Sequence, residues 1–155
     1  MRMRKCGVVV AALAAVLAVS GPTATADQKV TELRAYVVAG GKPRGVVEGQ
    51  HWQSYAMLRD AADKRIGDVS IACVVVKARD KRVLADCGHA LRIDGKGTLL
   101  IHGTHHYRDQ TVMPGTADPM RHIVTGGTGD FAHASGTADL LEVIGGYTYK
   151  LGGLG

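Results

Sequence analysis

The chain has 155 residues, 46% hydrophobic and 21% charged, with a formal net charge of +5, and this length suits a single domain. Three of its 19 basic residues and none of its 14 acidic ones lie in the first 26 residues, so residues 27–155 carry 16 basic against 14 acidic residues, a net charge of +2. An excess this small does not indicate binding to nucleic acid or to an anionic membrane surface.

Residues 1–26 predict a cleavable secretory signal peptide. Arg2, Arg4 and Lys5 make a basic start, and residues 8–19 form an apolar run that is too short for a transmembrane helix of about 20 residues. The Ala24-Thr25-Ala26 sequence then provides small residues at a cleavage site. A buried N-terminal helix is the alternative. We expect the mature domain, residues 27–155, to be secreted and to have no membrane segment.

The rest of the chain predicts short strands joined by turns. Residues 59–65 are polar and indicate a turn, with a short helix as the alternative; DGKG at 94–97 and GGTG at 126–129 are further turns, and 108–120 is a long loop. Strands are expected at 30–38, 51–58, 66–78, 83–93, 98–107, 122–125, 135–144 and 147–151.

This pattern favours an all-β fold. No stretch keeps a helical period over three turns, and no repeat of 20–50 residues is present in the sequence. Strands and turns at this spacing are typical of an antiparallel barrel or sandwich.

Two cysteines remain after signal cleavage, Cys73 and Cys87. If residues 79–81 form a three-residue hairpin loop, the numbers of paired residues sum to 160, which places the two cysteines directly opposite each other. Export would put them in an oxidising compartment, so we predict a disulfide. Two free buried thiols are the alternative.

Several segments together resemble the allene oxide cyclase barrel family, whose wider superfamily includes the dirigent proteins. Residues 123–131 read IVTGGTGDF, and Ala134 and Gly136 follow. KRIG at 64–67 leads into CVVV at 73–76, GTLLIHG occupies 97–103, and VTEL at 30–33 precedes Tyr36. The order and spacing of these segments carry the resemblance.

The resemblance implies a single eight-stranded antiparallel β-barrel with an apolar lumen. It also implies a small apolar ligand and a homo-oligomer, a trimer in the plant cyclases. Where those cyclases carry a glutamate after the first-strand tyrosine, this chain has Val37, and their asparagine falls near Tyr55. Their lumen cysteine corresponds to Cys73.

Strand alternation predicts which side chains face the lumen. With Cys73 and Cys87 inside, Ile71, Val75, Ala85, His89 and Leu91 point inside too. His89 is then a candidate acid or base, or alternatively a hydrogen-bonded core histidine. Tyr55 and Trp52 are candidates to line the mouth and contact a ligand, with Tyr55 as a second catalytic candidate; ordinary core packing is the alternative.

Five histidines crowd the second half of the chain: His102, His105, His106, His122 and His133. We expect no metal site and no cofactor, because His105 does not share strand parity with His102 and His106 and no carboxylate or cysteine completes a ligand set. Exposed strand and loop positions are the expected setting of these histidines.

Three functions follow from this sequence. The first is a cyclase or isomerase that holds a reactive apolar intermediate in the lumen. The second is a non-catalytic, lipocalin-like binding or steering protein for a small apolar molecule. The third is a secreted structural or interaction module.

Overall fold

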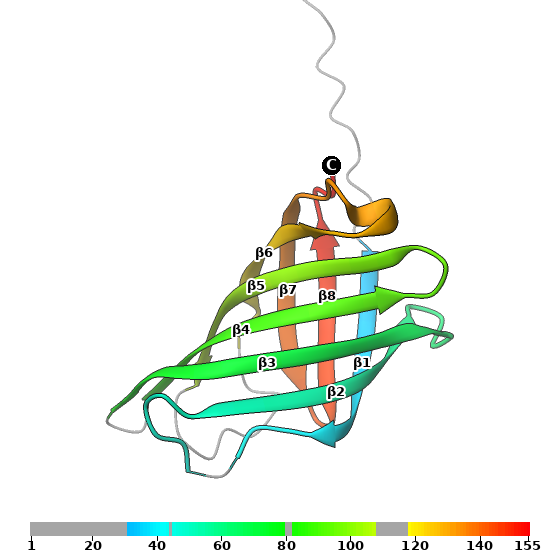
Figure 1. The fold of residues 1–155 in the computed structure, drawn as a ribbon. Helices are drawn as coiled ribbons and strands as arrows, with labels where there is room; N and C mark the ends of the chain where they lie inside the picture. Colours follow the sequence, from blue (N-terminus) through cyan, green and yellow to red (C-terminus); the bar gives the residue numbers. More distant parts are fainter. Residues whose placement is uncertain (1–30, 44, 80–81, 108–117) are drawn as a thin grey trace, which may run out of the picture.

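The computed structural model describes residues 31–43, 45–79, 82–107 and 118–155 (Figure 1). The predicted signal peptide lies outside these residues, as do Val30 and most of the expected 108–120 loop. Within the described part of the chain, no helix has the length and apolar character needed to cross a bilayer. The elements are β1 (Thr31–Gly40), β2 (His51–Asp60), β3 (Arg65–Arg79), β4 (Arg82–Ile93), β5 (Gly97–Tyr107), β6 (Met120–Gly127), the 3₁₀ helix η1 (Gly129–Phe131), β7 (Gly136–Val143) and β8 (Gly146–Gly152).

The eight strands form one closed antiparallel barrel. Each strand pairs with the next in sequence, and β1 pairs with β8 to close the sheet, with Leu33 opposite Tyr149. Figure 1 shows the long β3, β4 and β5 strands crossing the front of the barrel at a steep angle to β7, β8 and β1. The predicted eight-stranded antiparallel barrel is confirmed.

The barrel interior follows from strand alternation, because every second side chain of each strand points into the lumen. On β4, for example, Ala85, Cys87, His89 and Leu91 are buried, while the residues at 84, 86, 88 and 90 are partly exposed. Closure places the inward side chains of all eight strands in one interior, and this interior is the core of the protein.

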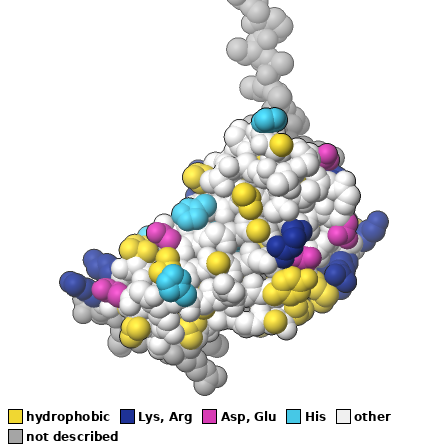
Figure 2. Space-filling model, viewed as in Figure 1, with side chains coloured by type: hydrophobic (Ala, Val, Ile, Leu, Met, Phe, Trp, Pro, Cys, Tyr) yellow, Lys and Arg dark blue, Asp and Glu magenta, His cyan; other side chains and the backbone are white. Residues whose placement is uncertain are grey.

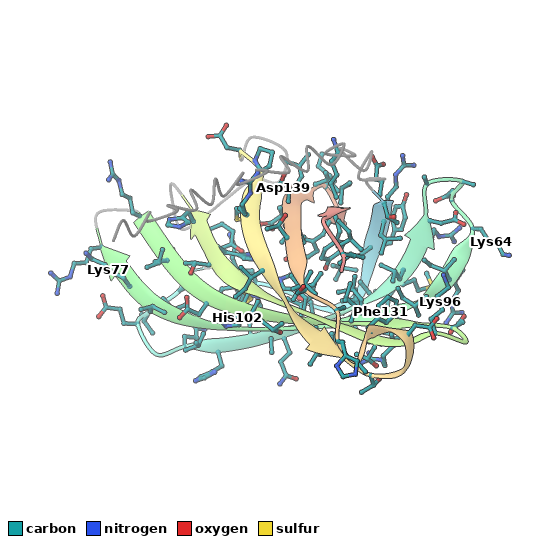
Figure 3. The ribbon with its side chains drawn as sticks, turned by 90° about the horizontal axis from the view of Figure 1, so that it is seen from above. Lys64, Lys77, Lys96, His102, Phe131 and Asp139 are labelled. Atoms are coloured by element: carbon teal, nitrogen blue, oxygen red, sulfur yellow. A yellow bond between two sulfur atoms is a disulfide. The ribbon has the colours of Figure 1, made fainter. Side chains whose placement is uncertain are left out.

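The two ends of the lumen differ in chemistry. Figure 3 labels Lys77 at one end of the barrel and Lys64 and Lys96 at the other, close to η1. At the η1 end the inward side chains are aliphatic, with Leu33, Leu58, Leu91, Leu99 and Leu151 buried. The polar inward side chains lie further along the strands, toward the β3–β4 hairpin.

The polar segment 59–65 is a turn, and the helical alternative is wrong. β2 runs to Asp60, and the Asp60 Oδ1 accepts hydrogen bonds from the backbone N–H groups of Ala62 (3.0 Å) and Lys64 (2.9 Å). Asp63 adopts a φ of 63°, which suits a tight turn. A short polar side chain that binds nearby backbone amides in this way competes with helix formation.

The predicted disulfide is confirmed, although the hairpin differs from the expected one. Cys73 and Cys87 lie opposite each other on β3 and β4, with their sulfur atoms 2.03 Å apart. β3 extends through Arg79, which pairs with Arg82, so a three-residue loop at 79–81 is wrong. A bulge between Val75 and Lys77 absorbs one residue and restores the register in which paired numbers sum to 160. A disulfide between residues 14 positions apart contributes about 3 kcal/mol to the free energy of unfolding.

Candidate functional site

Three histidines from three adjacent strands meet in the lumen. His89 of β4, His105 of β5 and His122 of β6 are 2%, 0% and 1% exposed, and we call them the histidine cluster. Their ring centroids are 5.3 Å (His89–His105), 5.5 Å (His89–His122) and 5.0 Å (His105–His122) apart. The other four histidines, His51, His102, His106 and His133, are exposed, so the histidine side chains visible in Figure 2 belong to that set.

Hydrogen bonds hold two rings of the cluster in place. His89 Nδ1 lies 2.9 Å from the Tyr149 hydroxyl, and His105 Nδ1 lies 3.0 Å from the Tyr107 hydroxyl. The Nε2 atoms of His89 and His105 face each other at 3.2 Å. One neutral ring donates and the other accepts in that contact, so each of the two rings uses both nitrogens.

His122 is placed differently. Its Nδ1 lies 3.0 Å from the backbone carbonyl oxygen of Met120. A carbonyl oxygen only accepts, so the ring proton is on Nδ1 and Nε2 carries a bare lone pair. This Nε2 is buried and has no hydrogen-bond partner among the described residues.

Gly103 provides the space for the His122 ring. A Cβ atom at position 103 would lie 2.4 Å from His122 Cδ2 and 2.5 Å from Cγ. The ring therefore lies directly against the β5 backbone, and a larger residue at 103 would push it away.

We expect Gly103→Ala to destabilise the fold by about 1–3 kcal/mol in urea unfolding, because the added methyl group overlaps the buried ring. Gly88→Ala is the matched control, since its nearest neighbour, His102 Cδ2, is 4.0 Å away. Equal stability of the two variants would contradict this placement of His122.

Burial controls the charge of the cluster. Loss of solvation, together with the neighbouring His122, lowers the pKa of His105 to about 3. Desolvation also lowers the pKa of His89 and of His122; in His122 the hydrogen bond to the Met120 carbonyl opposes this effect. All three rings are therefore neutral at neutral pH.

The lowered pKa of His105 predicts a stability loss in mild acid. Below the ordinary histidine pKa of about 6.5 the unfolded chain takes up a proton that the folded ring does not. The full free energy of unfolding is therefore retained only above that pH. It falls by about 1.4 kcal/mol per pH unit for this histidine as the pH drops from 6.5 toward its folded pKa. Urea unfolding between pH 7 and pH 5, with EDTA present, measures the slope.

His105→Asn should flatten that slope, and Tyr55→Phe, at a side chain that is 40% exposed, should leave it unchanged. The same slope in all three proteins would contradict the assignment of a neutral buried His105.

A second group of polar side chains lies toward the Lys77 end of the lumen, beside the cluster. Tyr107 lies beside the Glu142 carboxylate and shifts its pKa, and the Trp52 and Tyr107 ring centroids are 6.5 Å apart. Lys42 Nζ lies 4.1 Å from the centroid of the Tyr107 ring. We call Lys42, Trp52, Tyr107 and Glu142 the mouth group.

The mouth group contains two acid–base side chains with shifted pKa values. Burial raises the pKa of Glu142, and the Lys42 charge and the Tyr107 hydrogen bond oppose that rise. Burial also raises the pKa of Tyr107, so this phenol stays protonated and able to donate. The Tyr107 hydroxyl, 3.0 Å from His105 Nδ1, thus links the mouth group to the histidine cluster.

A solvent-facing groove of about 1090 Å³ reaches the same tyrosine. Its lining includes Tyr107 and His106 of β5, Val83 and Leu84 of β4, and three basic side chains, Lys77, Arg79 and Arg82. Figure 3 shows Lys77 at this end of the barrel. Tyr107 therefore connects the groove to the buried site.

The residues that could hold a metal ion are those of the histidine cluster. One ring nitrogen from each of His89, His105 and His122 lies within 4.8 Å of the other two. The sulfur atoms of Cys73 and Cys87 also lie within 4.8 Å of a His105 ring nitrogen, but they are joined in the disulfide and are not thiolate ligands.

The site residues expected from the sequence fall into two groups. His89 and Trp52 lie in the lumen, in the cluster and the mouth group respectively, and Ile71, Val75, Ala85 and Leu91 are buried in its wall. Tyr55 is 40% exposed on the outer face, so its expected place at the lumen mouth is wrong. Residues 52 and 55 differ by an odd number on one regular strand and point to opposite faces.

Sequence reasoning missed most of the polar site. The expectation that His105 and His122 occupy exposed positions is wrong, since both are buried, whereas His102, His106 and His133 are exposed as expected. A signal for His105 was present: the turn at 94–97 pairs Cys87 with Gly103, which puts residues 103 and 105 on the inner face.

Structural comparison finds similar barrels of known structure. The chain resembles a pyocyanin demethylase with a TM-score of 0.65 and 20% identity, over 81% of this chain and 99% of that one. It resembles an exo-specific intermolecular Diels-Alderase with a TM-score of 0.57 and 15% identity, over 81% and 97%. A nonspecific heme-binding cyclase, which catalyses a cycloaddition in neoabyssomicin biosynthesis, matches with a TM-score of 0.56 and 14% identity, over 83% and 63%.

No protein-family model and no curated protein matches the chain. The structural likenesses show a shared barrel fold, and function has to be argued from the site.

Proposed function

We propose that this protein is a secreted enzyme of the cyclase or isomerase type, related to the allene oxide cyclase and dirigent barrels, that binds one small apolar molecule beside the mouth group. One observation carries the proposal. The buried Trp52 Nε1 and Glu142 Oε2 have no hydrogen-bond partner among the described residues. A buried donor and a buried acceptor left unpaired in the same part of a lumen favour a ligand that pairs with them.

The surroundings indicate the class of ligand. The rings of Trp52 and Tyr107 provide flat apolar surface, and Val75 and Val83 are buried nearby in β3 and β4. A largely apolar molecule with one oxygen function would bury its body on these side chains and pair its oxygen with Trp52 or Glu142.

The proposed chemistry is rearrangement within one substrate. Glu142 as a carboxylate takes a proton from one carbon of the bound molecule and returns it to another, so that the enzyme ends unchanged. Tyr107 donates a hydrogen bond to Glu142, or to the substrate oxygen as negative charge develops there. The lumen wall holds the substrate in a reactive shape.

The comparisons support a cyclase-type function without identifying the reaction. Two of the similar barrels are named for cycloaddition chemistry, which forms rings from unsaturated precursors. The trimers of the plant cyclases suggest a homo-oligomer, which would cover exposed apolar side chains such as Tyr36, Leu100 and Ile123.

A non-catalytic binding or steering protein is the second candidate. It is favoured by Val37, which stands where the plant cyclases carry a glutamate after the first-strand tyrosine. In that case the mouth group would bind the same class of ligand without proton transfer.

Trp52 is the only tryptophan of the chain, so its fluorescence reports on the surroundings of the mouth group. We expect saturable quenching by one cis-parinaric acid per chain. Incubation with small polyenes and epoxy-polyenes, followed by chromatography and mass spectrometry, should yield a product of unchanged mass and altered retention. We expect Glu142→Gln to reduce turnover by about 100-fold, with less than a tenfold effect on binding.

Tyr55→Phe, on the outer face, is the matched control and should behave as the wild type. Saturable binding with every compound recovered unchanged would support the binding protein. Absence of saturable quenching would contradict both the enzyme and the binding-protein functions.

A further inference from the structure

We propose that the histidine cluster is a metal site in which His89, His105 and His122 bind one divalent transition-metal ion, Zn²⁺ being the best fit, through their Nε2 atoms. This differs from the sequence expectation of no metal, which treated His105 and His122 as exposed. The inference stands on the geometry of the cluster and does not depend on which small molecule the lumen takes.

The spacing of the nitrogens suits tetrahedral coordination. Two imidazole nitrogens that bind one Zn²⁺ at 2.0–2.1 Å are separated by about 3.3 Å in a tetrahedral site. The Nε2 atoms of His89 and His105 are 3.2 Å apart. One ring nitrogen of His122 lies within 4.8 Å of the other two ligand atoms, so a movement of about 1.5 Å completes the set.

The opposite nitrogens are arranged as in known histidine–metal sites. A metal-binding histidine nearly always donates its second ring N–H to an oxygen, which fixes the ring and makes it a better ligand. Here each Nδ1 has such an oxygen: Tyr149 for His89, Tyr107 for His105 and the Met120 carbonyl for His122. For His105 the chain of contacts continues from Tyr107 to the Glu142 carboxylate, a charge that complements a bound cation.

A purely structural role for the cluster leaves one atom unexplained. Hydrogen bonds within a packed core account for both nitrogens of His89 and of His105. They do not account for His122 Nε2, a buried lone pair without a partner among the described residues. An acceptor this well buried costs about 1–3 kcal/mol when it is left unpaired, and a metal ion would satisfy it.

Metal binding leaves the number of protons on the three rings unchanged, so no external acid or base is needed. In the metal-free cluster, one proton lies between the facing Nε2 atoms of His89 and His105. When the metal binds, that proton moves to Nδ1 of His89, where the Tyr149 hydroxyl accepts it, because a hydroxyl can donate or accept. All three rings stay neutral, and burial already favours the neutral form that ligates metals.

Three protein ligands leave a fourth position on a tetrahedral ion, as in catalytic zinc sites. An oxygen of a lumen ligand could occupy it and be polarised by the metal. The hydrogen bond between His105 and Tyr107 links the histidine cluster to the mouth group.

Metal binding to the untagged full-length secreted protein tests the proposal. After treatment with EDTA and dialysis, the protein is titrated with Zn²⁺ against a chromophoric chelator and, separately, with Co²⁺. We expect one ion per chain and the visible absorption bands of tetrahedral Co²⁺ with nitrogen ligands. The Co²⁺ spectrum of the wild type needs no variant, so it remains decisive if a variant fails to fold.

Variants locate the ion. His122→Asn and His105→Asn should each weaken Zn²⁺ binding by at least about 100-fold, and Tyr107→Phe, which keeps the ring, by about tenfold. His102→Asn and His106→Asn remove exposed histidines from the same strand and should leave binding unchanged. Circular dichroism verifies that each variant is folded.

Two results would overturn the proposal: no tetrahedral Co²⁺ spectrum in the folded wild type, or binding that is lost in the His102 and His106 variants and kept in the His105 and His122 variants. Neither result bears on the quenching of Trp52, so failure of the metal site and failure of the proposed function are distinguishable.

Discussion

β1 pairs with β8 and closes the sheet, and closure turns the alternating faces of eight strands into one shared interior. Residues far apart in sequence become neighbours for this reason: His89 and Tyr149 are 60 positions apart and share a 2.9 Å hydrogen bond across the lumen. Closure also removes the unpaired strand edges on which an open sheet would aggregate.

Polar side chains inside a closed lumen lose their hydration, and they need hydrogen-bond partners there to offset that loss. Leucines fill the end near η1, while the histidines and tyrosines are confined to the rest of the lumen and bonded to one another. The exceptions are informative, since Trp52 Nε1, His122 Nε2 and Glu142 Oε2 are buried without a partner among the described residues. In a lumen that is otherwise well satisfied, these three atoms mark where a ligand or an ion would bind.

The fold was largely predictable because it rests on local patterns: strand alternation, glycine turns and the opposition of Cys73 and Cys87. Even there the expected loop was wrong, and a bulge after Val75 compensated for it. Such a bulge leaves no clear mark in a β-branched run. The site was less predictable, because His105, His122 and Glu142 lie on three different strands. Their meeting depends on register and closure together, and the sequence shows neither directly.

His89 illustrates the same limit. Alternation placed it inside the barrel, but its character depends on what faces it. Tyr149 and His105 occupy its two nitrogens, so it is one member of a cluster of neutral rings.

The most direct test of this account is long-range ¹H–¹⁵N NMR of the imidazole rings in the metal-free protein, followed from pH 7 to pH 5. The His89 and His105 rings should stay neutral throughout, and the His122 ring should carry its proton on Nδ1 at pH 7. Proton uptake by the His89 and His105 rings near the ordinary histidine pKa of about 6.5 would contradict this placement, because these rings would then face water and not a closed lumen.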